Sequence, residues 1–100
     1  MNTWINEDMR TLFAALLSLE TEEECRRVLE DLCTVKELGD MAQRLKIARL
    51  LRAKTSYAAI HQETGISTAT ISRVSRCLDY GAGGYDLVLA RLNGEGRNDG

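Results

Sequence analysis

Apolar side chains recur along the first half of the chain at the spacing of amphipathic helices. Within residues 4–19 and again within 21–33 they repeat every three or four positions, which places them on one face of a helix. Thr21 and Thr34 are each followed three residues later by a glutamate, the signature of a capping box at a helix start. The second box opens a longer helix, expected over about 34–54. No segment has a strong strand pattern, so the chain is predicted to be all-α.

The second half of the chain contains a short helix, a glycine turn and a longer helix. Ser56 is placed to cap the first helix, expected over 57–63, and Ser67 to cap the second, expected over 68–80. Gly65 lies between them and can adopt the positive φ that a tight turn requires. The pattern therefore predicts a helix-turn-helix.

The length of 100 residues corresponds to a single domain. We expect this domain to cover 1–92, with dimerisation helices at about 4–54, the helix-turn-helix at about 56–80 and a last helix at about 85–92. The remaining residues, 93–100, are polar and rich in glycine, and they are predicted to be disordered.

Four apolar residues are predicted to hold the helix-turn-helix together. Ile60 faces back toward the preceding helices, and Ile66 closes the turn. Ile71 and Val74, three residues apart, press the second helix against the first. Earlier in the chain, the helix within 21–33 is expected to turn a further group inward: Cys25, Val28, Leu29, Leu32 and Cys33.

The second helix of the motif exposes small, neutral or basic side chains at its start. Small side chains allow a helix to enter the major groove, where hydroxyl groups and arginine reach base edges and phosphates. The helix N-terminus adds a positive dipole end that favours a phosphate. We therefore predict that Thr68, Ala69 and Thr70 discriminate bases. The outward residues are Ser67, Thr68, Ala69, Thr70, Ser72 and Arg73.

The distribution of charge supports nucleic acid as the partner. The whole chain has a net charge of −2, but residues 42–78 have a net charge of +6, whereas residues 1–41 have −6. A concentrated positive segment is what phosphate binding requires, although a solvated helix face also has this composition. Phosphate contacts are assigned mainly to four residues, and Ser67 completes the predicted DNA-binding set. The four are Arg44, Arg52, Lys54 and Arg73.

A series of short motifs runs through the same segment. They are Ala42-Gln43-Arg44-Leu45, Leu50-Leu51-Arg52, Glu63-Thr64-Gly65, the run from Ser67 to Val74, Arg76-Cys77-Leu78, Tyr80-Gly81 and Gly84-Tyr85. With these motifs the chain resembles the Trp repressor superfamily, and within it the YerC/YecD branch of Trp-repressor-like proteins. The likeness covers residues 32–92, and matches at 23–25 and 30–34 extend it. The resemblance implies six helices and an intertwined homodimer whose paired recognition helices bind a pseudo-palindromic DNA site.

Two positions depart from the Trp repressor pattern beside the place where its corepressor binds. Val74 stands where the resemblance implies a glycine that leaves room for the indole ring, and Cys77 replaces a serine that binds the ligand. Arg44 and Arg73 correspond to the two arginines that flank the tryptophan there. Because the slot between them is expected to be partly filled, we predict that tryptophan is not the corepressor. The protein then binds DNA constitutively or responds to a different small molecule.

His61 is a further departure, because many helix-turn-helix motifs, and this branch, have alanine at its position. An imidazole that pointed inward would widen the crossing of the two helices. Alternatively, it tilts outward and lies at the surface, since Trp repressor also tolerates a long polar residue there.

Other classes of function fit the sequence less well. An enzyme is not expected, because the acidic residues crowd helix starts and His61 has no evident catalytic partners. Neither a metal site nor a cofactor is expected, since Cys25, Cys33 and Cys77 form no CxxC pair. The chain lacks a long apolar run and a signal-peptide pattern, which favours a cytoplasmic location. The main alternative is a helical protein-interaction module without DNA binding, which would expose an apolar face on the second helix of the motif.

Overall fold

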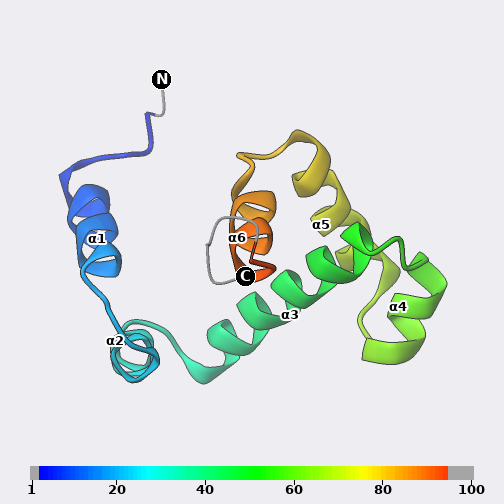
Figure 1. The fold of residues 1–100 in the computed structure, drawn as a ribbon, viewed down its shortest axis with the longest axis horizontal. Helices are drawn as coiled ribbons and strands as arrows, with labels where there is room; N and C mark the ends of the chain where they lie inside the picture. Colours follow the sequence, from blue (N-terminus) through cyan, green and yellow to red (C-terminus); the bar gives the residue numbers. More distant parts are fainter. Residues whose placement is uncertain (1–2, 95–100) are drawn as a thin grey trace. The chain divides into compact units, whose positions relative to one another are not determined.

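The computed structural model describes residues 3–94, and every regular element within them is an α-helix. The helices are α1 (Glu7–Leu17), α2 (Glu22–Leu32), α3 (Val35–Arg52), α4 (Tyr57–Thr64), α5 (Thr68–Tyr80) and α6 (Gly84–Leu92) (Figure 1). The prediction of an all-α, six-helix chain is confirmed. Most of the tail predicted to be disordered, from residue 95 onward, lies outside the described residues. Within the described part, no helix is both long and apolar enough to cross a membrane.

The chain divides into two compact units between Leu38 and Gly39, a boundary inside α3. The first unit contains α1 and α2, and neither helix has a buried residue. Cys25 and Leu32 were expected to point inward, but both are exposed, Leu32 over 58% of its surface. This expectation is wrong within the single chain, because helical spacing shows which side chains share a face and not what covers that face. The single domain expected over 1–92 stays a prediction.

Side-chain caps fix the starts of α2 and α3. The N–H of Glu24 donates to Oγ1 of Thr21, and the N–H of Glu37 donates to Oγ1 of Thr34, each at 3.1 Å. The carboxylate of Glu37 in turn accepts the N–H of Thr34 at 2.8 Å, which completes a capping box. Both helix starts lie where the sequence predicted them.

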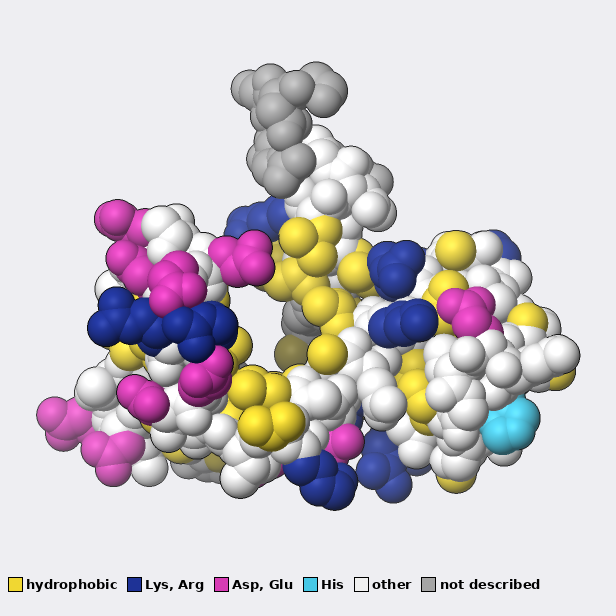
Figure 2. Space-filling view, turned by 90° about the horizontal axis from the view of Figure 1, so that it is seen from below, with side chains coloured by type: hydrophobic (Ala, Val, Ile, Leu, Met, Phe, Trp, Pro, Cys, Tyr) yellow, Lys and Arg dark blue, Asp and Glu magenta, His cyan; other side chains and the backbone are white. Residues whose placement is uncertain are grey.

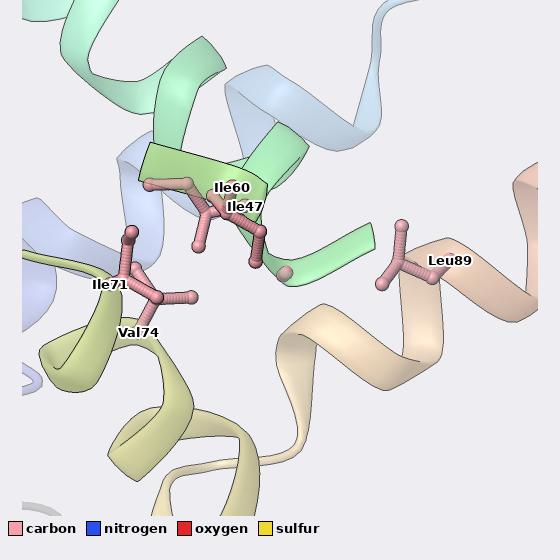
Figure 3. Close-up of a cluster of buried hydrophobic side chains, with 6 residues drawn as sticks. Ile47, Ile60, Ile71, Val74 and Leu89 are labelled. Atoms are coloured by element: carbon pink, nitrogen blue, oxygen red, sulfur yellow. The ribbon is translucent and has the colours of Figure 1, made fainter. Parts of the chain in front are cut away.

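The second unit has one buried core, to which α3, α4, α5 and α6 all contribute. Ile60 of α4 meets Ile71 and Val74 of α5, as predicted, and Ile47 of α3 joins them (Figure 3). Leu89 of α6 belongs to the same core and lies apart from these four side chains in this view. Ile47, Ile60 and Ile71 are fully buried. Burial of one such side chain contributes about 1.5–3 kcal/mol. The core therefore holds the two helices of the helix-turn-helix against the rest of this unit.

The turn after α3 places one residue in a strained conformation. Lys54 has a φ of 68°. The N–H groups of Lys54 and Thr55 donate to the carbonyl groups of Leu51 and Leu50, each at 3.0 Å. This is a Schellman arrangement, whose left-handed position is usually glycine because other residues have a Cβ that crowds the backbone.

Lys54→Gly is expected to be more stable than Lys54→Ala by about 1 kcal/mol, because glycine relieves the left-handed strain while both variants lose the same amine. Denaturant titration of the two variants measures this difference in the free energy of unfolding. Equal stabilities would show that position 54 does not hold this conformation in solution.

Candidate nucleic-acid interface

The predicted base-reading surface is Ser67 to Thr70, the first turn of α5 with its cap, which we call the reading turn. Oγ of Ser67 accepts the N–H of Thr70 at 3.2 Å, and the Ser67 hydroxyl donates to Oγ1 of Thr70 at 3.1 Å. Thr68 and Ala69 are exposed, whereas Thr70 is half-buried. The first turn of α5 contains no acidic residue. With Ser67, which is also exposed, the reading turn thus presents three small exposed side chains beside the positive end of a helix dipole.

Gly65 sets the angle at which α5 leaves α4. Gly65 ends α4 with a φ of 75°, and its N–H donates to the carbonyl of His61 at 2.8 Å. A Cβ at this position would meet no atom within 4 Å, so glycine is needed for its backbone conformation and not for space. Behind the turn, Ile60 and Ile71 are buried where α4 packs against α5.

Side chains of α4 also bind the turn itself. Nδ1 of His61 lies 2.7 Å from the carbonyl oxygen of Ile66. Oγ1 of Thr64 accepts the N–H of Ile66 at 3.1 Å, and the same hydroxyl donates to the carbonyl of Ile60 at 2.7 Å. The imidazole of His61 is exposed, which is the outward of the two orientations considered for it.

Arg44 of α3 and Arg73 of α5 line the same pocket, whose volume is about 600 Å³. Thr70 of the reading turn and Val74 also line it. The two cations outnumber the one carboxylate of this surface, that of Asp40, and this balance favours an anionic partner such as a phosphate group. Two of the predicted phosphate contacts are therefore brought together with the reading turn. The rest of the wall consists of Asp40, Gln43, Thr64, Gly65, Ile66, Cys77 and Tyr85.

Val74 belongs both to the wall of this pocket and to the buried core. Its side chain is only 2% exposed and lies in one cluster with Ile60 and Ile71. The isopropyl group therefore supports α5 from the core side. Its effect on a ligand between Arg44 and Arg73 stays a prediction.

Arg52, a third predicted phosphate contact, is bound within the second unit. Its Nε and Nη2 donate to the two carboxylate oxygens of Asp86, each at 2.9 Å, and Nη2 also donates to the carbonyl of Leu78 at 3.3 Å. The guanidinium lowers the pKa of Asp86, chiefly through this hydrogen bond. The pair joins α3 to α6 and α5, so to bind a phosphate Arg52 must either share its charge with Asp86 or leave this exposed ion pair. Lys54, the fourth predicted phosphate contact, is exposed in the turn after α3.

Two features of this surface were not expected from the sequence. They are the bond from His61 to the turn and the pairing of Asp86 with Arg52. The first depends on a side-chain orientation and the second joins residues 34 positions apart, so neither has a local sequence signal. Among the residues that the structure describes, no group of histidine, cysteine and acidic residues is arranged to hold a metal ion.

Comparisons with known proteins agree with one another. Residues 7–93 match the sequence model of the family described as Trp repressor protein. The protein YerC of Bacillus subtilis strain 168 is 50% identical over 86 residues, which cover 86% of this chain and 83% of YerC. A crystal structure of a TrpR-like protein from Eubacterium eligens ATCC 27750 has a TM-score of 0.87 and a sequence identity of 43%. The match covers 93% of this chain and 96% of the E. eligens chain. A structure from Staphylococcus aureus has a TM-score of 0.85 at 44% identity and covers 90% of each chain.

Proposed function

The chain belongs to the Trp repressor family, and from this premise we propose that it is a sequence-specific DNA-binding regulator that represses transcription as a homodimer. The reading turn carries this proposal. It is an exposed, acid-free helix start that a buried core holds beside Arg44 and Arg73. A protein-interaction module would instead need an apolar exposed face at this place.

The proposed contacts follow from the position of each side chain. Thr68 and Ala69 are exposed and small enough to approach base edges in a major groove. Thr70, which lines the pocket and whose hydroxyl oxygen accepts the Ser67 hydroxyl, completes the proposed base-reading set. Ser67 orients the turn as its cap, and the helix N-terminus faces a phosphate. Phosphate neutralisation is proposed for Arg44, Arg52, Lys54 and Arg73.

Selection of binding sites from genomic fragments tests the proposal. A dimer with two reading turns is expected to enrich a pseudo-palindrome whose half-sites lie about one helical turn apart. A pool that stays random after several rounds, with the protein folded, would contradict sequence-specific binding. Enrichment of a lone half-site would contradict the homodimer and leave DNA reading intact.

Exposed apolar side chains support the homodimer. The first unit buries none of the residues of its two helices, although α1 and α2 have clear apolar faces. A chain of this size gains stability by covering such surface with a second copy. Apolar side chains are open to solvent on the face shown in Figure 2. The large exposed ones in the helices include Phe13, Leu16, Leu17, Leu32, Leu87, Val88 and Leu92.

Sedimentation at micromolar concentration is expected to show a dimer, with no folded monomer on dilution. Leu17→Glu is expected to break the dimer, because it places a carboxylate on a side chain that is 85% exposed in the single chain and that we expect a second copy to cover. Thr11→Glu, at another exposed position of α1, is the matched control. A well-folded wild-type monomer, or equal effects of the two substitutions, would contradict this arrangement.

We further propose that tryptophan is not the effector of this regulator. Val74 lines the same pocket as the two arginines although it is only 2% exposed, and its isopropyl group stands where the Trp repressor pattern implies a glycine that leaves room for the indole ring. DNA binding is then constitutive, or a different small molecule occupies the remaining volume. A change in DNA affinity with an added metabolite pool would favour the second of these.

A further inference from the structure

One exposed side chain bridges α4 and the start of α5. His61 is the only histidine of the chain, and its imidazole lies uncovered at the surface, cyan in Figure 2. Its Nδ1 is 2.7 Å from the carbonyl oxygen of Ile66, five residues along the chain. The bond therefore spans the turn of the helix-turn-helix, from His61 in α4 to Ile66, the residue just before the cap Ser67.

The bond holds the peptide group that joins Ile66 to the cap of α5. The carbonyl of Ile66 and the N–H of Ser67 belong to one rigid peptide plane. Holding that carbonyl therefore orients the backbone at Ser67, which caps α5 and begins the reading turn. The opposite side of Ile66 is held as well, because its N–H donates to Oγ1 of Thr64 at 3.1 Å.

We infer that His61 is a positioning residue of the DNA-reading helix, whose Nδ1–H fixes the peptide plane that leads into the reading turn. The inference rests on the proposed function and adds a residue to it that does not itself touch a base. Both polar groups of Ile66 are bound by side chains of α4, and its own side chain packs against the core. The turn is thus held on three sides, and His61 supplies the one solvent-exposed support.

The geometry determines which ring nitrogen carries the proton. A carbonyl oxygen only accepts hydrogen bonds, so Nδ1 must be the donor. In the neutral imidazole Nε2 is then the acceptor that faces solvent. Nitrogen chemical shifts of the imidazole at alkaline pH, in the absence of DNA, are expected to report the Nδ1–H tautomer. The Nε2–H tautomer would overturn the inference whatever the protein binds.

Substitutions separate the hydrogen bond from the bulk of the ring. His61→Ala is expected to lower the affinity for the selected DNA site by about tenfold, since each dimer loses two exposed hydrogen bonds that are worth about threefold each. His61→Asn is expected to recover most of this loss, because its amide nitrogen can donate from nearly the same place. Gln62→Ala, at the next exposed position of α4, is the matched control and is expected to bind as the wild type does.

Each outcome decides one question. If the wild type prefers its site and His61→Ala binds equally well, the inference is overturned and the proposed function stands. If alanine and asparagine weaken binding equally, the donor at Nδ1 is not the cause and the inference is also overturned. If the wild type has no preferred site at all, the proposed function fails, and the tautomer alone decides whether His61 holds the turn.

Discussion

Replacing Thr68 and Ala69 together by leucine is expected to lower the affinity for the selected DNA site by about a thousandfold, to the level of random DNA. Both residues are exposed in the reading turn, and two bulky side chains would keep α5 from approaching the base edges. The arginines beside the turn are unchanged. Salt-dependent binding to random DNA is therefore expected to remain nearly intact.

The choice of Ala69 over Thr70 follows from the structure. Thr70 is half-buried and accepts the hydroxyl of Ser67, so its replacement would also disturb the cap of α5. Ala82→Leu, at an exposed position between α5 and α6, is the control for added bulk. Anisotropy titrations on selected and random duplexes measure the effect. Unchanged site preference in the double variant would mean that another surface reads the DNA.

Calorimetric titration with L-tryptophan is expected to show no micromolar binding to the unmodified protein. Val74 replaces the glycine that the Trp repressor pattern implies, and overpacking by its added carbons costs about 1–3 kcal/mol, or about tenfold to a hundredfold in affinity. Cys77, also in the pocket wall, offers a weaker partner for the polar end of the ligand than a serine hydroxyl. Micromolar binding together with tighter DNA binding would contradict this prediction.

The companion experiment repeats the titration on Val74→Gly. Tryptophan binding that appears only in Val74→Gly would support the prediction that the side chain of Val74 fills the slot for the indole ring. Because Val74 is 2% exposed in the core, the variant is also expected to lose about 3 kcal/mol of stability, from the cavity and from glycine within a helix. The titration is therefore carried out well below the unfolding temperature of the variant, where the protein is folded. Val74→Ala, which opens less space at a lower cost, is the control for destabilisation without room for an indole.

The helices could be predicted closely because their start signals are local. Thr21 and Thr34 cap their helices as the sequence indicated. The first helix is the exception: the apolar pattern suggested a start near Trp4, whereas α1 begins at Glu7. Asn6 accepts the N–H of Met9 at 2.9 Å and so caps the helix. The apolar pattern extends to Trp4 and Ile5, which precede the helix start, and this start is defined by the hydrogen bond of the Asn6 side chain.

The reading turn was predictable for the same reason, whereas its supports were not. Ser67, Thr68 and Ala69 are contiguous and exposed as the sequence predicted, whereas Thr70, which was also expected to face outward, is half-buried. The bond between Arg52 and Asp86 joins α3 to α6 and depends on the packed fold. Leu32 is apolar and lies on the apolar face of α2, so the sequence predicted that it is buried, but the sequence does not identify the surface that would cover it.

DNA reading through the reading turn is tested most directly by two affinities of the wild-type protein, one for the selected site and one for a random duplex of equal length. Both are measured at several salt concentrations. Both affinities are predicted to fall as salt rises, since phosphate contacts release counterions. At each salt concentration the protein is predicted to bind the selected site at least about a thousandfold more tightly than the random duplex. Equal affinities for the two duplexes, or affinities that do not change with salt, would contradict the claim.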